Sequence, residues 1–518
     1  MRYPANVPAR NQVANFTSVQ APVGGWNALD ALADMKPSEA ITLDNWYPKP
    51  TYVEIRGGSA SHATGMTGTG KTLVVYRALT GTDKMFCSTE SGVYNVSVSG
   101  AVGASVASRT NGKHQWLMFG DGTSNWLIMV NGVDKPLYYD GTTWIAVDGA
   151  SSPALTGITT TKLVGVAIFK GRLIFLEKDS LSFWYLTSGV AGGALTRFDL
   201  SGVAQKGGYI MAASSWTVDS GAGPDDRMVF VTSAGEVIVY QGTNPGSAST
   251  WALIGVYVIG TPLGRKCIVK TGSDLVIITQ NGAFPLSAIW QESGVNYARA
   301  VSRKIEPVFN DSARLYGSNF GWKATLFQAQ SAIIFNVPVL ENGTHYQYVM
   351  NTITQAWCRF TGWNAEDFEV FNGELYYCQG TTVIKAWTGT GDQGNNIDAY
   401  AKGAFNYFSS RGQLKKFNLY RPVFNVNSSL AFLTDLDIDF DNKPIVATAS
   451  YTPTNYAVFG VSKWGDATWA PGLIAVRNWQ VSSNWLGYCA ATKIKISTKT
   501  ILVQWVSTDY IIEVGSGL

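Results

Sequence analysis

Short runs of β-branched and aromatic residues, broken by glycine, asparagine, aspartate or serine, extend along nearly all of this 518-residue chain. Residues 126–130, 172–176 and 275–278 are examples. Runs of four to eight such residues bounded by turn formers are typical of β-strands, and 54 glycines supply the turns. Helical periodicity is confined to two short stretches, residues 30–35 and 303–313. The sequence therefore predicts an all-β protein.

Composition narrows the class of protein further. Charged residues make up 14% of the chain, against about 25% in an ordinary soluble protein, and aromatic residues make up 13%. Such a composition excludes wholesale disorder and a coiled coil. The net charge of +3 gives no overall field suited to a dedicated nucleic-acid binder. Because interface cores are rich in aromatic residues and poor in lysine and glutamate, we expect an oligomer.

Membrane and redox features are sparse. No stretch approaches 18 consecutive apolar residues, so we predict no membrane span, and the first residues contain no apolar run long enough for a signal peptide. Cysteines are odd in number, widely scattered and without zinc-ligand spacing. We predict reduced, buried thiols in a protein made in a cytoplasm, at Cys87, Cys267, Cys358, Cys378 and Cys489.

A repeat runs through the middle of the chain. Residues 137–144, 239–251 and 375–387 each read as a strand, a Gly-Thr turn and a second strand that carries or reaches a tryptophan. A further hairpin lies upstream of each. Three to four antiparallel strands recurring every 40–60 residues favour the blades of a β-propeller. We predict five to seven blades between residues 63 and 395, and an array of β-sandwiches is the alternative that spacing leaves open.

Changes in residue composition along the chain indicate three regions. Residues 1–62 are rich in proline and suit an extended N-terminal arm that packs along other parts of an assembly. The glycine-rich loop at residues 389–396 reads as a linker. We therefore predict an arm at 1–62, a propeller at 63–395 and a separate, sandwich-like β domain at 396–518.

One string matches a nucleotide-binding motif. Residues 65–72 read GMTGTGKT, which fits the P-loop pattern G-x-x-x-x-G-K-T. A working P-loop follows a buried strand directly and opens a helix. Residues 59–64 do not read as a strand, and residues 73–79 are β-branched and stopped by glycine. We interpret the string as a turn before the first propeller strand.

Four aspartates alternate along one predicted strand, at Asp435, Asp437, Asp439 and Asp441. A period of two places them on one face. Carboxylate clusters can bind calcium, but usually on loops, so these four are metal candidates only. We favour a solvated acidic face or a channel wall kept negative, and we predict no cofactor.

The densest basic run, residues 411–421, interleaves cations with aromatic residues. Its cations could contact DNA phosphates or the carboxylates of a neighbouring subunit, and a solvated strand face is the alternative. The candidates for such contact are Arg411, Lys415, Lys416 and Arg421.

The sequence offers few candidate catalytic residues. Only three histidines exist, His62, His114 and His345, and none lies in a recognisable nucleophile or metal pattern. A pair of glycosidase carboxylates cannot be identified from one sequence. We predict that the protein is not an enzyme.

Residues 21–35, APVGGWNALDALADM, and residues 39–48, EAITLDNWYP, resemble the opening of tail nozzle (tail tubular) proteins of short-tailed bacteriophages, or podoviruses. The P-x-G-G-x-N and L-D-N-x-x-P elements of that family are complete here. The resemblance covers most of the chain, and members generally lack the string at 65–72. It continues at residues 53–58, 206–209, 235–243, 251–255 and 414–416.

This resemblance implies a structural virion protein. In the family, a β-propeller with β additions assembles as a six-fold ring below the portal and adaptor, closes the tail until infection, and then conducts double-stranded DNA into the host. The implied partners are copies of the same chain, the tail adaptor, and tail fibres or spikes. The implied location is the phage tail, after assembly in the host cytoplasm. A near-balanced charge suits a conduit, because every neutralised phosphate adds a salt-dependent hold on DNA.

Three other functions stay open on the sequence. One is a tail-associated propeller that binds or cleaves glycans for host recognition. The second is a nucleotide-driven enzyme built on residues 65–72. The third is a host-encoded adhesin, which the missing secretion signal disfavours.

Overall fold

The computed structural model describes residues 14–219, 224–292, 294–445, 448–451, 473–476 and 478–515. The chain divides into two compact units. The larger consists of Ser59–Met350 and Phe360–Thr388, and the smaller of Met1–Gly58, Asn351–Arg359 and Gly389–Leu518. Strand β32 (Trp357–Thr361) contains one of the boundaries between them.

Seven groups of mainly antiparallel strands, each called a sheet below, build the larger unit, together with the short pair β16 (Leu155–Thr156) and β20 (Gly193–Ala194). The first two contain β7 (Gly70–Tyr76), β8 (Lys84–Thr89), β9 (Gly92–Asn95) and β11 (Ala107–Ser108), then β12 (Gln115–Gly120), β13 (Asn125–Val130), β14 (Leu137–Tyr139) and β15 (Trp144–Ala146). The next two contain β17 (Leu163–Phe169), β18 (Arg172–Glu177), β19 (Ser182–Tyr185) and β21 (Thr196–Asp199), then β22 (Ile210–Asp219), β23 (Pro224–Thr232), β24 (Glu236–Gly242) and β25 (Trp251–Val258). The fifth contains β26 (Ile268–Thr271), β27 (Asp274–Thr279) and β28 (Gly282–Pro285), and the sixth contains β29 (Lys323–Phe327), β30 (Ala332–Pro338) and β31 (His345–Asn351). The seventh contains β33 (Asp367–Phe371), β34 (Glu374–Gln379), β35 (Thr382–Ala386), β6 (Ser59–Thr64) and β10 (Gly100–Ala101).

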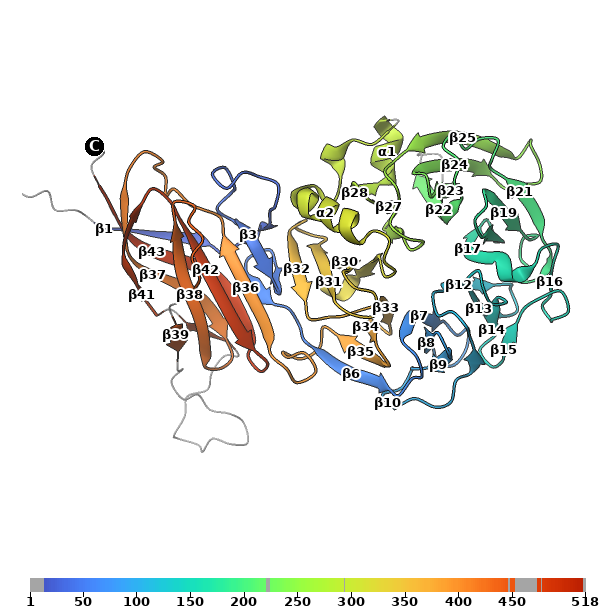
Figure 1. Cartoon of the computed structure of the whole chain (residues 1–518), viewed down its shortest axis with the longest axis horizontal. Coiled ribbons are helices and arrows are strands. Elements are labelled where there is room, and N and C mark those ends of the chain that lie inside the picture. Colours follow the sequence, from blue (N-terminus) through green and yellow to red (C-terminus); the bar gives the residue numbers. More distant parts are fainter. Residues whose placement is uncertain are drawn as a thin grey trace, which may run out of the picture. The chain divides into compact units, whose positions relative to one another are not determined.

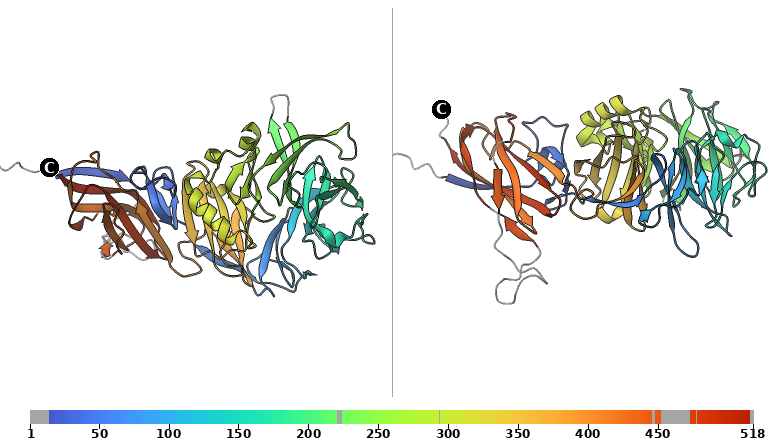
Figure 2. Two further views of the ribbon diagram at one scale, coloured as in Figure 1. Left: turned by 45° about the horizontal axis from the view of Figure 1, so that its top comes forward. Right: turned by 60° about the horizontal axis from the view of Figure 1, so that its bottom comes forward.

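These sheets follow one another around a ring (Figures 1 and 2). From β12 onward the first strand of each sheet contacts the first strand of the next, and β33 of the last sheet contacts β7 of the first. The ring is closed by β6, which comes from the start of the unit and pairs antiparallel with β35 from its end. The prediction of an all-β chain with a β-propeller is confirmed, and we call this the propeller unit.

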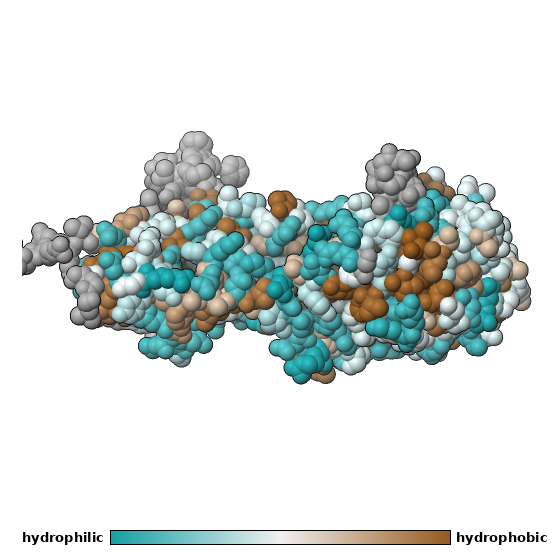
Figure 3. Space-filling model, turned by 90° about the horizontal axis from the view of Figure 1, so that it is seen from above, coloured by the Kyte–Doolittle hydropathy of each residue, from teal (hydrophilic) through white to brown (hydrophobic). Residues whose placement is uncertain are grey.

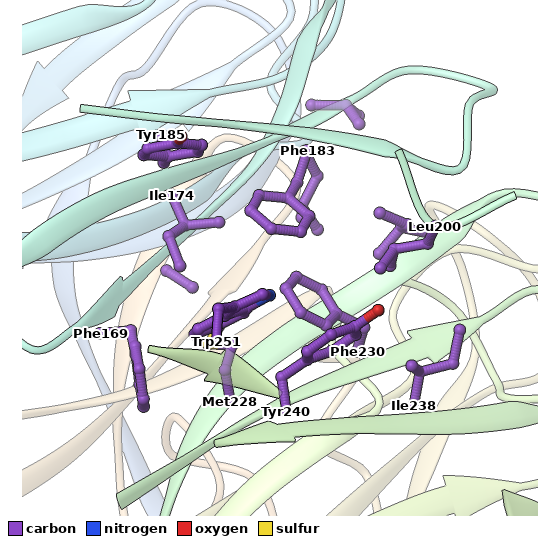
Figure 4. Close-up of a cluster of buried hydrophobic side chains, with 14 residues drawn as sticks. Phe169, Ile174, Phe183, Tyr185, Leu200, Met228, Phe230, Ile238, Tyr240 and Trp251 are labelled. Atoms are coloured by element: carbon purple, nitrogen blue, oxygen red, sulfur yellow. The ribbon is translucent and has the colours of Figure 1, made fainter. Parts of the chain in front are cut away.

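The core of the propeller unit lies between neighbouring sheets. Figure 4 shows one such cluster, where Phe183 of the third sheet stacks on Phe230 of the fourth with ring centroids 4.7 Å apart. Tyr240 and Trp251 of the fourth sheet stack 5.1 Å apart in the same cluster. Because a blade cannot bury both faces alone, each sheet depends on its neighbours for stability.

Helices are short. Helix α2 (Glu306–Tyr316) confirms the helical stretch predicted at residues 303–313. The helix predicted at 30–35 is wrong, because these residues form turns. Helix α1 (Leu286–Glu292) was not predicted. Single 3-10 turns occur at η1 (Thr160–Lys162), η2 (Tyr297–Arg299), η3 (Arg303–Ile305) and η4 (Gln328–Gln330). Among the described residues, no helix has the length and apolar character needed to cross a membrane.

Two sheets form the smaller unit. One contains β1 (Ala14–Gln20), β4 (Trp46–Pro48), β5 (Val53–Ile55), β37 (Lys415–Val426), β40 (Ile474–Val476), β41 (Gln480–Gly487) and β43 (Val503–Val514). The other contains β2 (Gly25–Trp26), β3 (Glu39–Asp44), β36 (Ile397–Gly403), β38 (Leu430–Ile438), β39 (Thr448–Tyr451) and β42 (Ala490–Thr498).

The two sheets pack face to face. Phe417 and Tyr510 of the first share a buried cluster with Leu436 and Ala490 of the second, and the hydroxyl groups of Tyr510 and Thr492 form a hydrogen bond across the interior. This packing confirms the predicted sandwich-like C-terminal region, and we call it the sandwich unit.

The predicted domain boundaries need correction. Residues 14–58 do not form a separate arm but are part of the sandwich unit, because β1 pairs with β43 and β3 pairs with β36, and residues 1–13 lie outside the described residues. The loop read as a linker also belongs to this unit, since Asp392 forms an ion pair with Arg56 at 2.6 Å. The propeller therefore runs from residue 59 rather than 63 and ends at 388 rather than 395.

The prediction that the cysteines are unpaired and buried is confirmed. All five thiols are free and buried. Burial raises the pKa of the Cys267 thiol to about 12, so this thiol stays protonated at neutral pH.

Ring closure gives a first testable prediction. Ala63 of β6 is fully buried in the cluster that joins the last sheet to the first, and Ala60 on the same strand is exposed. Ala63→Asp would place a carboxylate in that cluster, so we expect a loss of about 3 kcal/mol or more in the free energy of unfolding. Ala60→Asp should change it by no more than about 0.5 kcal/mol. Urea unfolding followed by tryptophan fluorescence measures both, and equal effects would refute the role of β6.

Candidate functional site: a charged central channel

The first strands of the propeller sheets surround a channel that contains two connected cavities. One cavity, which we call the chamber, has a volume of 260 Å³ and is lined mainly from β12, β17, β22, β26, β29 and β33. The wider mouth has a volume of 650 Å³ and is lined largely by the segments that lead into these strands. The two cavities share Gln115, Met211, Arg265, Lys266 and Lys323.

Asp367 is the centre of the channel wall. Its side chain is 1% exposed, and its Oδ2 lies 2.9 Å from Lys266 Nζ and accepts a 3.0 Å hydrogen bond from the Leu73 backbone. Lys323 Nζ lies 3.0 Å from Oδ1. Burial opposes ionisation, but the two ammonium groups outweigh it and hold the pKa of Asp367 below its usual value. One carboxylate thus connects the first, fifth, sixth and seventh sheets.

A second buried carboxylate lies beside it. Glu366 Oε2 is 3.1 Å from Lys71 Nζ, and both side chains are 2% exposed. Glu366 Oε1 accepts a 2.6 Å hydrogen bond from the backbone of Asn342 and lies 3.9 Å from His345 Nε2. Burial lowers the pKa of His345, so its imidazole is neutral at physiological pH.

An aromatic ring stands among the cations at the mouth. Phe320 lies in the segment between α2 and β29, and three ammonium groups face its ring at 4.8 Å for Lys113, 5.8 Å for Lys266 and 5.9 Å for Lys71. Such distances are typical of cation–π attraction. The ring therefore narrows the mouth and contributes to holding these lysines.

Two further cations in the chamber lack carboxylate partners. Arg265 donates from Nη1 to the carbonyls of Ile210 and Met211, and Lys270 donates to Ser215. Burial lowers the pKa of both cations. In the described part of the chain, neither of them has an acidic group within ion-pair distance.

The titratable groups in and beside this channel are engaged with one another. Its carboxylates are held by lysines, and its histidine lies beside a carboxylate rather than a nucleophile. Over the described residues, no three His, Cys, Asp or Glu side chains are grouped so that they could hold a metal ion.

The P-loop-like string takes the form of a turn and a strand. Gly65 and Gly68 have φ of 87° and 82°, and β7 begins at Gly70 where a P-loop would open a helix. The Lys71 ammonium group forms an ion pair with Glu366 and donates a hydrogen bond to Asn342, so it is not available to bind a phosphate. The expectation that residues 59–64 are not a strand is wrong, because they form β6, whose partner β35 fixes its conformation.

The expected acidic face of residues 435–441 is also wrong. Asp437 is fully buried between Lys402 Nζ at 2.7 Å and Lys493 Nζ at 2.6 Å. Asp435 is buried, while Asp439 and Asp441 follow the end of β38 and are exposed. Asp439 accepts hydrogen bonds from two backbone amides, and Asp441 pairs with Lys443. These metal candidates therefore have separate partners and no common point of coordination.

The basic run 411–421 does not form one surface. Lys415 is fully buried and donates to backbone carbonyls, including that of Tyr488 at 3.0 Å. Arg411 pairs with Asp34 at 2.8 Å, and Arg421 with Asp509 at 2.7 Å. Lys416 is half-buried on β37.

The other histidines have structural surroundings. His62 contacts the carbonyl of Val96 at 2.9 Å. His114 lies buried against Ser88 and Asn131, and burial lowers its pKa to about 4. The channel itself was missed by sequence reasoning. One pattern could have indicated it: charged residues stand at or just before the first strand of several sheets, at Lys71, Lys113, Lys266, Lys323 and Asp367.

Comparisons with known proteins concern the fold alone. No protein-family model matches the chain, and no curated protein matches its sequence. Similar solved structures include the extracellular domain of the putative hybrid two component system BT3049 from B. thetaiotaomicron, at TM-score 0.40 and 10% identity over 66% of this chain. The chain spans 45% of the length of that structure. BBS1N in complex with ARL6DN matches at TM-score 0.39 and 9% identity, over 65% of this chain and 100% of its own. Raptor of Chaetomium thermophilum matches at TM-score 0.37 and 9% identity, over 65% of this chain and 29% of its own.

The ion cluster around Asp367 gives a second prediction. Asp367→Asn leaves Lys266 and Lys323 buried without a full counter-charge, so we expect a loss of about 3–5 kcal/mol in the free energy of unfolding. Glu369→Gln removes a carboxylate from the same Lys323 at a side chain that is 20% exposed, and it should cost no more than about 1 kcal/mol. Urea unfolding at pH 7 compares the two variants, and equal losses would contradict a central role for Asp367.

The same cluster predicts a pH dependence. The pKa of Asp367 is lower in the folded than in the unfolded chain. Its ionised carboxylate therefore contributes fully to the free energy of unfolding above the unfolded pKa of about 4. This contribution is lost as the pH falls through the folded pKa. Between pH 7 and pH 3 the wild type should therefore lose more stability than Asp367→Asn, and parallel pH profiles would contradict the assignment.

Proposed function

We propose that this chain is a structural subunit of the tail nozzle of a short-tailed bacteriophage, forming a ring that closes the DNA channel and conducts the genome into the host. The observation that carries the proposal is the sequence likeness of residues 21–48 to that family. Composition adds support, because a low fraction of charged residues suits a chain that covers much of its surface with copies of itself.

The likeness falls on residues with structural roles. Gly25 has φ of 79°, and a Cβ atom built on it would lie 2.5 Å from the backbone nitrogen of Trp357. Asn27 is buried and donates to the carboxylates of Asp30 and Glu39 at 2.7 Å each. The P-x-G-G-x-N element therefore fixes the backbone beside β2 and β3.

The L-D-N-x-x-P element acts in the same way. Asn45 has φ of 58°, donates to the carbonyl of Asp398 at 2.8 Å and accepts from Arg56 Nε at 2.9 Å. Trp46 is fully buried and stacks on Phe424 of β37. Motifs that hold a scaffold together, rather than surround a reactive group, suit a virion protein.

Exposed apolar residues offer surfaces for neighbours. Figure 3 shows an area of hydrophobic residues on one face of the propeller unit. The outer strand β25 is an open sheet edge that carries exposed Leu253, Ile254 and Val258. Edges of this kind pair or pack with another chain unless they are protected.

The path of DNA in this proposal lies between copies rather than through one propeller. The chamber has a volume of 260 Å³, which is far too small for a DNA duplex. Ion pairs of Asp367 with Lys266 and Lys323 also join the strands that line the channel, so they oppose its widening. The bore is then the space enclosed by the ring, and loops that constrict it would move aside when host contact perturbs the tail.

The proposal is tested by whether the purified chain assembles into rings and by where the chain is located in phage particles. We expect the purified full chain to form rings with a central hole in negative stain, at about six times the mass of one chain by light scattering. Gold-labelled antibody against the chain should bind the tail of intact particles, and pre-immune antibody should not. A chain that stays a monomer at high concentration and is absent from purified virus would overturn the proposal.

A variant at Gly65 distinguishes the proposed structural function from nucleotide hydrolysis. Gly65 is the first glycine of the P-loop-like string, and a Cβ atom there meets nothing within 4 Å. Gly65→Ala should cost about 1 kcal/mol for its positive φ and leave ring assembly intact. ATP hydrolysis by the wild type that Gly65→Ala abolishes would favour the enzyme, and glycan binding by the isolated chain would favour host recognition.

A further inference from the structure

The chamber carries an excess of positive charge. Four cations line it, Arg265, Lys266, Lys270 and Lys323, against the single carboxylate of Glu369. Asp367 lies behind the wall and pairs with Lys266 and Lys323. Two carboxylates therefore face four cations, and the difference is two positive charges.

This excess belongs to Arg265 and Lys270. Lys266 is compensated by Asp367, and Lys323 is shared between Asp367 and Glu369. Removing cations from bulk water is costly unless opposite charge or hydrogen bonds replace the lost hydration. Arg265 is half-buried, and two backbone carbonyls supply only part of that replacement, whereas Lys270 is exposed and makes one hydrogen bond, to the Ser215 hydroxyl.

Their unused donors define the ligand chemistry. A guanidinium group has five N–H donors, and the hydrogen bonds of Arg265 to Ile210 and Met211 both leave from Nη1. Among the described residues Nε and Nη2 have no hydrogen-bond acceptor, and they form the fork that matches two oxygens of one oxyanion. The guanidinium group also lies over the Tyr209 ring, 5.2 Å from its centroid, which leaves the edge of the fork available. Lys270 adds a point charge with donors beyond the one that contacts Ser215.

We propose that the chamber binds a phosphate group, held by the fork of Arg265 and the ammonium group of Lys270, with Lys266 and Lys323 adding positive charge. A dianion would balance the two excess charges. The volume of 260 Å³ suits a phosphate group rather than a polymer, and the 650 Å³ mouth leaves room for the remainder of a phosphate ester. The site is independent of the proposed tail function.

The experiment uses the full chain. Isothermal titration with sodium phosphate at pH 7.5 should give saturable binding with one site per chain, and phosphate should raise the melting temperature. Sodium chloride at matched ionic strength is the control for general screening. Adenosine monophosphate forms a second arm. Tighter binding of the ester identifies a phosphate ester as the ligand source, and tighter binding of phosphate identifies the free ion; both results support the site.

Charge-matched variants locate the binding. Arg265→Gln and Lys270→Gln each remove one charge-assisted contact and should weaken phosphate affinity about tenfold or more. Lys135→Gln removes one charge from an exposed pair with Asp148 that does not line the channel, and it should change the affinity by less than about twofold.

Lys270 is exposed, so its variant should fold, and thermal melting of each variant checks this. Arg265→Lys is the second test if Arg265→Gln unfolds, because it keeps the charge and loses the fork. The proposal is overturned if the folded wild type shows no saturable binding, or if chloride stabilises it as much as phosphate does. It is also overturned if Lys270→Gln binds phosphate as tightly as Lys135→Gln does.

Discussion

The propeller depends on one buried carboxylate. Apolar faces hold each sheet to the next, and charged contacts add a directional constraint that dispersion and burial do not supply. Asp367 fixes β33 against Leu73 of β7, Lys266 before β26 and Lys323 of β29 through directed contacts of about 3 Å. Buried ion pairs contribute little net stability over apolar packing, so we interpret the cluster as a device for setting alignment around the ring.

The sandwich unit repeats this device. Asp437 of β38 lies between Lys402 of β36 and Lys493 of β42, which are three strands of one sheet. In both units a buried aspartate lies between two lysines from different strands. Some of the few charged residues of this chain therefore lie in its interior, where they pair with one another.

Periodic features could be predicted from the sequence, and features set by distant partners could not. The strand, Gly-Thr turn and tryptophan strand at 137–144 became β14 and β15, because the pattern is local. The segment at 59–64 has few β-branched residues, and β35, more than 300 residues later, makes it a strand. Alternation placed Asp435 and Asp437 on a strand correctly, but burial between two lysines depends on β36 and β42. The channel was missed for the same reason, since strands of six sheets line its cavities.

The basic run at 411–421 shows how pairing changes what a charge can do. The sequence presents four cations that could hold DNA, but Lys415 is enclosed, and Arg411 and Arg421 already face Asp34 and Asp509. A cation paired with a carboxylate releases fewer counterions on meeting a phosphate, so it adds less to the hold on a duplex. Arg265 and Lys270 have no such carboxylate among the described residues, and they line a cavity of 260 Å³, which is far too small for a duplex. In the tail nozzle that we propose, pairing Arg411 and Arg421 with carboxylates would weaken the hold on the genome and let it slide past.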